Sequence, residues 1–121
     1  MTPSLNHIDH WIFDLDNTLY PPSAKLFDLI DVRMRGFIMR LLNVAENEAH
    51  DVQKDYFHRY GTTMAGLMQH HGVAPEDFLV DVHDIALDRL DRDERLRAGL
   101  ERLPGQRYIY TNADADYAAR V

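Results

Sequence analysis

The chain of 121 residues contains no cysteine. This absence excludes a disulfide scaffold, a zinc site built on thiolates and a cysteine nucleophile. No apolar run approaches the roughly 18 residues that a membrane-spanning helix needs, and residues 1–10 lack the charged and apolar regions of a secretory signal. We therefore expect a soluble, cytoplasmic protein with no membrane partner.

Basic residues are also scarce, because 13 Lys and Arg face 20 Asp and Glu and give a net charge of -7. This balance disfavours nucleic-acid binding through a broad basic surface. A phosphate ester is still compatible with an acidic chain, since a divalent cation and backbone N–H groups supply positive charge locally. The hydrophobic content of 45% is enough for the core of one small globular domain.

Two short segments rich in aliphatic and aromatic residues predict buried β-strands. The first covers residues 8–13 and stops at Asp14, and the second covers residues 108–110 and stops at Thr111. Polar residues follow each strand directly. In α/β proteins this position, at the carboxyl ends of strands, is where ligands bind.

Between the two strands, apolar residues recur every three or four positions, which is typical of amphipathic helices. Residues 23–85 are therefore expected to be helical, with Ser23 as the first N-cap. Gly61 is placed to end the second helix in the left-handed conformation. The apolar face of the first helix is predicted to contain Leu26, Ile30, Met34, Phe37 and Leu41.

Shorter helices are expected further along the chain. Residues 62–63 supply a threonine cap for one that ends at Gly72, and Pro75 opens another. A charged helix over residues 91–103, closed by Pro-Gly, precedes the second strand. A last helix is expected over residues 114–121.

Asp14 and Asp16 are separated by one residue directly after the first strand, so a loop can direct both carboxylates into one site. Two neighbouring carboxylates repel each other unless a cation lies between them or one is protonated. Mg²⁺ meets this need, because it takes a few carboxylate oxygens and shares its other positions with water and phosphate. In such a site Asp14 can attack phosphorus while Asp16 carries protons.

These residues also have simpler interpretations. A short Asp-x-Asp is more often a turn whose aspartates cap backbone groups. A calcium loop of the EF-hand type is excluded, because Leu19 stands where glycine is needed and Lys25 where glutamate is needed. For Thr111 with Asn112, a helix N-cap is by itself a commoner role than phosphate binding.

Taken together, the motifs resemble the haloacid dehalogenase-like hydrolase superfamily. Phe-Asp-Leu-Asp-Asn-Thr-Leu-Tyr at residues 13–20 is similar to its first signature, and Tyr-Ile-Tyr-Thr-Asn-Ala at residues 108–113 to its second. The helical insertion between them resembles the first type of cap domain. Residues 19–21, residues 60–67 and Val-His-Asp at residues 82–84 resemble the pyrimidine 5'-nucleotidase branch.

The resemblance implies a role for each residue of the motifs. Asp14 is the nucleophile and Asp16 the acid/base, while Mg²⁺ is held by the Asp14 carboxylate and the Asp16 backbone carbonyl. Thr111, with Asn112 beside it, binds phosphate. The presence of Asp16 favours phosphatase over halide-releasing chemistry. The cap residues that would contact the nucleoside part of a small phosphate ester, such as a pyrimidine nucleotide, are Tyr60, Gly61, Thr62, Thr63 and Gly66.

The fold implied is α/β, an incomplete Rossmannoid core of the haloacid dehalogenase type with two parallel strands and a helical cap inserted after the first strand. The core corresponds to residues 1–22 and 104–121, and the cap with its connecting helix to residues 23–103. Only ten residues follow Thr111, so the family's third and fourth signatures, with a basic residue and further acids, are missing. We expect an N-terminal portion that binds Mg²⁺ weakly and has little phosphatase activity alone.

A second function from another class is a non-catalytic module, in which the helical cap binds a partner or associates with another copy of itself. The histidines do not favour a metal site, because adjacent residues such as His70 and His71 diverge on a helix and no third ligand has fitted spacing. His7 and His10 likewise have no third ligand at a fitted spacing.

Overall fold

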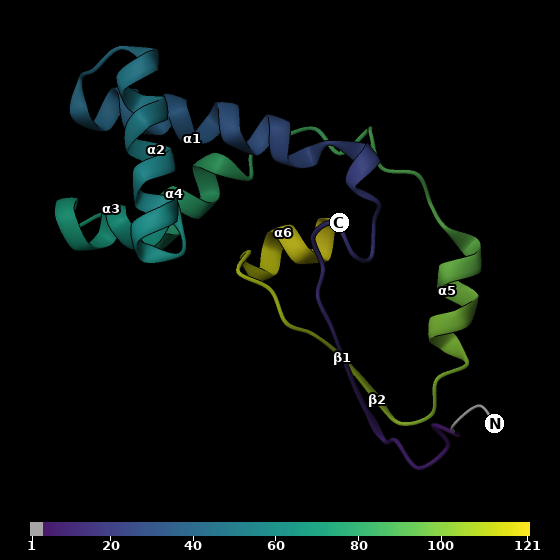
Figure 1. Cartoon of the computed structure of the whole chain (residues 1–121). Helices are drawn as coiled ribbons and strands as arrows, with labels where there is room; N and C mark the ends of the chain where they lie inside the picture. Colours follow the sequence, from purple (N-terminus) through teal and green to yellow (C-terminus); the bar gives the residue numbers. More distant parts are fainter. Residues whose placement is uncertain (1–3) are drawn as a thin grey trace. The chain divides into compact units, whose positions relative to one another are not determined.

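The computed structural model describes residues 4–121 and, within them, contains two strands, six α-helices and one 3₁₀ turn (Figure 1). The predicted order of strand, helical insertion, strand and helix is confirmed, and the fold is a mixed α/β arrangement. In chain order the elements are β1 (His10–Phe13), η1 (Pro22–Ala24), α1 (Leu26–Leu42), α2 (Glu46–Tyr60), α3 (Thr63–His71), α4 (Pro75–Val82), α5 (Glu94–Glu101), β2 (Gln106–Ile109) and α6 (Ala115–Arg120).

The described chain divides into two compact units. Residues 25–86 form the helical unit, with α1 to α4. Residues 4–24 and 87–121 form the strand unit, with both strands, η1, α5 and α6. No helix among residues 4–121 is both long enough and apolar enough to cross a membrane.

The helical unit is built on α1, which packs against α2 and α4, while α2 also packs against α3 (Figure 1). The predicted apolar face of α1 is confirmed at Leu26 and Ile30, which are buried, but it is wrong at Leu41, which is exposed. Ile38 is buried instead, because it continues the four-residue step from Ile30. The core of this unit contains Leu26, Ile30, Ile38, Ala49, Leu67, Phe78 and Val82.

The ends of these helices follow the turn residues of the sequence. Gly61, with φ of 86°, ends α2, and the Thr62 hydroxyl accepts the Ala65 N–H at 3.1 Å to cap α3. Ser23 is not the cap of α1, so that prediction was wrong. Pro21 and Pro22 lead instead into the η1 turn, and α1 begins after Lys25.

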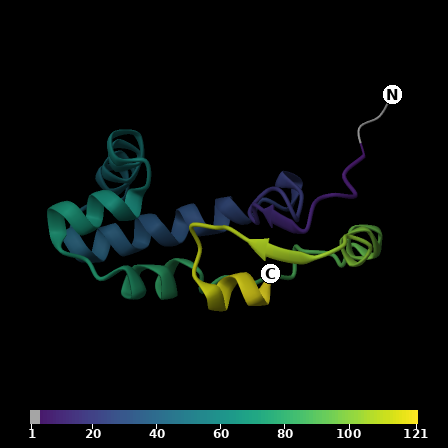
Figure 2. The same ribbon diagram turned by 90° about the horizontal axis from the view of Figure 1, so that it is seen from below.

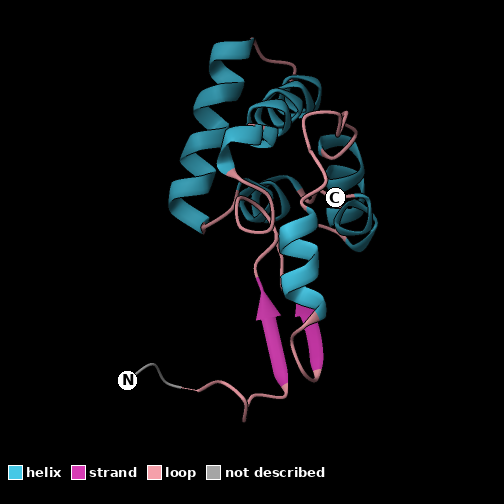
Figure 3. Ribbon diagram, turned by 90° about the vertical axis from the view of Figure 1, so that its right-hand side faces the viewer, coloured by secondary structure: helices cyan, strands magenta, loops and turns pink. Residues whose placement is uncertain are grey.

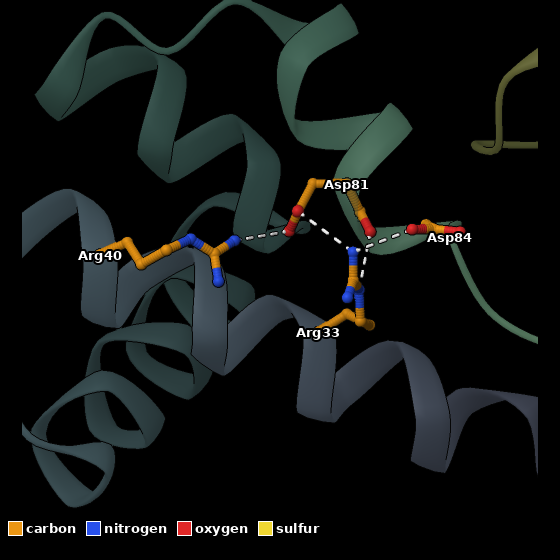
Figure 4. A network of polar contacts seen from close by, with 4 residues as sticks. All are labelled: Arg33, Arg40, Asp81 and Asp84. Carbon is orange, nitrogen blue, oxygen red and sulfur yellow. Dashed lines mark hydrogen bonds and ion pairs between the residues drawn. The ribbon is translucent and has the colours of Figure 1, made fainter.

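A network of charged side chains joins α1 to the end of α4 (Figure 4). Asp81 accepts hydrogen bonds from Arg33 at 3.2 Å and from Arg40 at 3.0 Å. The Arg33 Nε–H also donates to the backbone carbonyl of Asp81 at 2.9 Å, and Asp84 lies 3.5 Å from the same guanidinium. These contacts fix the C-terminal end of α4 on the α1 surface.

The strand unit contains a two-stranded parallel sheet in which His10 lies opposite Gln106 and Phe13 opposite Ile109 (Figure 3). The strands were predicted to be buried, and this was wrong. Every residue of β2 is exposed, and on β1 Ile12 is 71% exposed. Within the described chain no further strand extends this sheet, so its apolar side chains have little to pack against.

Two helices complete the strand unit. The charged helix is shorter than predicted, because the Asp93 side chain accepts the Leu96 N–H at 3.0 Å and thereby starts α5 at Glu94. After β2 the chain reverses direction into α6 (Figure 2). Asp114 caps α6 by accepting the Tyr117 N–H at 2.6 Å, so the last predicted helix is confirmed.

Candidate functional site

The loop after β1 is shaped by one hydrogen-bonded turn. The N–H groups of Thr18 and Leu19 both donate to the Leu15 carbonyl, at 3.2 and 2.9 Å. Asn17, in the middle of the turn, has φ of 55°, a conformation that asparagine tolerates better than most residues. This turn folds residues 14–18 back on themselves and brings the two aspartates of the motif into one small region.

The Thr18 hydroxyl lies between two oxygens of this loop. It is 3.3 Å from the Asp14 Oδ2 atom and 3.4 Å from the Asp16 backbone carbonyl. The other Asp14 oxygen accepts the Leu15 N–H at 3.0 Å, so the turn interpretation of the motif also holds in part. The Asp14 side chain is exposed. The Asp14 carboxylate and the Asp16 carbonyl both lie within 3.4 Å of the Thr18 hydroxyl oxygen, and both are hard oxygen donors of the kind that Mg²⁺ prefers.

Among residues 4–121, no group of three acidic or histidine side chains converges in a way that could hold a metal ion. The oxygens of the Asp14 loop thus supply at most a partial coordination shell. Mg²⁺ tolerates such a shell because it retains several waters.

The Asp16 side chain points to Tyr20, whose hydroxyl donates to Asp16 Oδ1 at 2.7 Å. Tyr20 is only 7% exposed, and Tyr117 from α6 is also buried. Burial, the hydrogen bond to Asp16 and the negative charge of Asp16 all raise the pKa of Tyr20 far above its usual range. Burial and the Asp16 charge also raise the pKa of Tyr117. Both phenols therefore remain neutral around Asp16 at ordinary pH.

Strand pairing brings Thr111 to the same end of the sheet as Asp14. The ladder ends with the Tyr110 N–H donating to the Phe13 carbonyl at 2.8 Å, one residue before each of the two polar segments. The Thr111 hydroxyl accepts the Ala113 N–H at 3.1 Å. Its own hydrogen remains available as a donor. Because Asp114 caps α6, neither Thr111 nor the exposed Asn112 serves as the N-cap.

The predicted substrate residues of the helical unit all have structural roles there. Gly61 ends α2 and Thr62 caps α3, as described above. The buried Thr63 hydroxyl donates to the Gln53 carbonyl at 3.0 Å. Gly66 lies against the Tyr56 ring, which a Cβ atom would overlap.

Tyr60 belongs to a cluster of aromatic rings between α2 and α3. Its hydroxyl pairs with His70, and the Tyr56 hydroxyl pairs with His71 at 2.8 Å. The His70 ring also stacks on Tyr56, with centroids 5.3 Å apart. The two histidines thus bind phenols of their own unit.

A cavity of about 540 Å³ opens in the strand unit beside the Asp14 loop. Its walls come from the segment that follows the motif, including Tyr20, and from residues 89–95.

Sequence reasoning missed Thr18, Tyr20 and Tyr117 as parts of the site. Tyr20 could have been found, because a residue four positions after Asp16 can come close to it when the chain makes a tight turn.

No protein-family model matches the chain. The chain is similar to phosphate metabolism protein 8 of Saccharomyces cerevisiae, with 27% identity over 120 residues. The aligned region covers 91% of this chain and 37% of that protein, so the chain spans well under half the length of this relative. The resemblance to haloacid dehalogenase-like hydrolases remains a prediction.

Proposed function

We propose that the chain is a Mg²⁺-dependent phosphate monoester hydrolase of the haloacid dehalogenase-like superfamily, with Asp14 as nucleophile and Asp16 as acid/base. The observation that carries the proposal is the parallel pairing of β1 with β2, which ends with Phe13 opposite Ile109. This pairing accounts for a carboxylate pair and a threonine hydroxyl at the carboxyl end of one sheet. The chain is also similar to a protein named for phosphate metabolism, and a phosphate substrate agrees with that name.

The first step would transfer the phosphoryl group to the enzyme. An oxygen of Asp14 forms a bond to phosphorus, and the bond between phosphorus and the ester oxygen breaks. Asp16, protonated at the start of the step, gives its proton to the leaving alkoxide. The exposed position of the Asp14 side chain is suited to direct attack on a bound ester.

The second step would hydrolyse the aspartyl-phosphate. Asp16, now a carboxylate, takes a proton from water while the water oxygen forms a bond to phosphorus. The bond between phosphorus and Asp14 breaks, which restores the Asp14 carboxylate and releases inorganic phosphate. The Thr111 hydroxyl, whose oxygen already accepts the Ala113 N–H, donates its hydrogen to a phosphoryl oxygen.

The Asp14 carboxylate and the Asp16 backbone carbonyl would hold Mg²⁺, since both oxygens lie near the Thr18 hydroxyl. The ion supplies positive charge next to the transferring phosphoryl group. Thr18 keeps the two oxygens facing each other by donating its one hydrogen to either of them.

For the substrate we propose a small phosphate ester such as a pyrimidine nucleotide. This part of the proposal rests on the resemblance of residues 60–67 to the nucleotidase branch.

The second candidate is a non-catalytic module that associates with another copy of itself. The exposure of apolar side chains on the sheet favours it, because Ile12 and Tyr110 are 71% and 79% exposed. Monomeric proteins rarely leave apolar patches of this kind uncovered.

The test measures hydrolysis of p-nitrophenyl phosphate by the purified chain with and without Mg²⁺. We expect slow turnover that needs Mg²⁺ and is abolished by Asp14→Asn, since the amide cannot form the phosphoryl bond. Asp16→Asn should reduce the rate about 10²- to 10⁴-fold. The matched control is Asp88→Asn, an exposed aspartate of the strand unit, which should leave the rate unchanged.

The oligomeric state, measured by sedimentation in the same preparation, separates the two candidates. Mg²⁺-dependent turnover lost in Asp14→Asn supports the hydrolase. Turnover that persists in Asp14→Asn refutes it. No turnover from a chain that forms a stable oligomer favours the module.

A further inference from the structure

We infer that Tyr20 is a positioning residue for the acid/base, and that it favours one oxygen of Asp16 for proton transfer. The inference rests on the proposed function. Its observation is the hydrogen bond of 2.7 Å from the Tyr20 hydroxyl to Asp16 Oδ1. No hydrogen bond to Asp16 Oδ2 is made within residues 4–121, so the two oxygens have different surroundings.

Tyr20 is held rigidly enough to impose this geometry. Its side chain is 7% exposed, and it lies four residues from Asp16 across the hydrogen-bonded turn that starts at Leu15. Pro21 and Pro22 follow and restrict the backbone on its other side. Tyr117, which is 1% exposed, comes from α6 and is close enough to contribute to the raised pKa of Tyr20.

The hydrogen bond is compatible with both protonation states that the reaction requires of Asp16. As a carboxylate, Asp16 accepts the Tyr20 hydrogen at Oδ1. As a carboxylic acid with its proton on Oδ2, it still accepts the same hydrogen at Oδ1, which is then the carbonyl oxygen. A proton on Oδ1 would require the Tyr20 hydroxyl to give up this bond and turn its hydrogen away. Tyr20 thus favours Oδ2 as the oxygen that gives and takes the proton in both steps.

The same contact fixes the side-chain rotamer of Asp16. A carboxylate in an open loop samples several χ1 rotamers, whereas one oxygen tied to a buried phenol leaves a single arrangement. Positioning of this kind acts on the chemical step, because small displacements of a proton donor slow the reaction without changing substrate binding.

The experiment compares the full chain with Tyr20→Phe and with the matched control Tyr110→Phe, which removes a hydroxyl from an exposed tyrosine of the same unit. The first measurement is the χ1 rotamer distribution of Asp16, from three-bond NMR couplings of its β protons. We expect one rotamer in the wild type and in Tyr110→Phe, and averaged couplings in Tyr20→Phe. Unchanged couplings in Tyr20→Phe would overturn the inference.

The second measurement separates kcat from KM for p-nitrophenyl phosphate. Tyr20→Phe should lower kcat about 10- to 100-fold and leave KM within about twofold, since the contact acts on proton transfer. A change confined to KM would count against the inference. Failure of the wild type to show turnover that depends on Asp14 would reject the proposed function, while the rotamer measurement would still decide the role of Tyr20.

A third measurement needs no variant and covers the case in which Tyr20→Phe does not fold. In the wild-type chain, with ¹³Cζ-labelled tyrosine in mixed H₂O and D₂O, the Tyr20 hydroxyl should exchange slowly and give a resolved isotope shift. The Tyr110 hydroxyl should exchange too fast to show one. Fast exchange at Tyr20 would mean that its hydroxyl is not held by Asp16.

Discussion

Replacing Asp81 by asparagine should destabilise the helical unit, because its carboxylate joins two helices of that unit. Asp81 joins α4 to α1 through both of its carboxylate oxygens, one bound by Arg33 and the other by Arg40 (Figure 4). Asparagine removes the charge and leaves one acceptor oxygen. The backbone carbonyl at this position keeps its bond to the Arg33 Nε–H, so the loss comes from the side chain alone.

The expected loss of unfolding free energy depends on how exposed the interacting side chains are. A hydrogen bond between charged groups contributes about 1.5 to 3 kcal/mol when it is buried, and an exposed ion pair about 0 to 1 kcal/mol. The side chain of Asp81 is 26% exposed and that of Arg40 is 63% exposed, so the Arg40 pair belongs near the lower limit and the Arg33 pair between the two. We expect Asp81→Asn to lower the free energy of unfolding by roughly 1 to 2 kcal/mol.

Urea unfolding followed by far-ultraviolet circular dichroism measures this change, because most of the helix lies in the helical unit. A loss of this size moves the midpoint by roughly 0.5 to 1 M. The control is Asp84→Asn. The Asp84 side chain lies 3.5 Å from Arg33 but is 82% exposed, so this variant should lose less than about 0.5 kcal/mol of unfolding free energy. Equal losses from the two variants would refute the assignment of Asp81 as the centre of the network. High salt should reduce the difference in unfolding free energy between the two variants, because it screens the ion pairs.

Two further predictions concern packing and pH. Gly66→Ala should destabilise the helical unit by about 1 to 3 kcal/mol, because its Cβ would overlap the Tyr56 ring, while Gly99→Ala, which meets no atom within 4 Å, should be neutral or stabilising in thermal melts. The raised pKa values of Tyr20 and Tyr117 stabilise the fold fully below pH 10, the unfolded pKa of tyrosine, and this stabilisation is lost as pH rises above it. The urea midpoint should therefore fall between about pH 9 and about pH 11, and fall less in Tyr20→Phe.

The helices could be predicted because their signals are local. The apolar spacing of α1, the threonine before α3, and Gly61 at the end of α2 each act within one or two turns of the chain. The errors arose where a local signal competed with a neighbour. Ser23 has the chemistry of a cap, yet the two prolines before it direct the chain into a 3₁₀ turn.

Burial of the strands could not be predicted, because it depends on contacts outside the segments themselves. An apolar and aromatic run favours a strand, and β1 and β2 do form and pair. Whether such a strand is covered depends on which elements pack on its two faces. In the described chain Tyr108, Ile109 and Tyr110 are all exposed, although their sequence is typical of a sheet core.

The candidate site is formed partly by a turn within residues 14–20 and partly by the pairing of two strands that are distant in sequence. Only the first part can be predicted from the spacing of residues along the chain. One hydrogen-bonded turn brings Asp14, Thr18 and the Asp16 carbonyl together, and Tyr20, four residues after Asp16, is close enough for its hydroxyl to reach the Asp16 carboxylate. The arrival of Thr111 depends on strand pairing across more than ninety residues, which the sequence could suggest only through a resemblance. Tyr117 was missed because its interaction with Tyr20 depends on two features at once. Strand pairing places α6, and the turn after β1 directs Tyr20 inward.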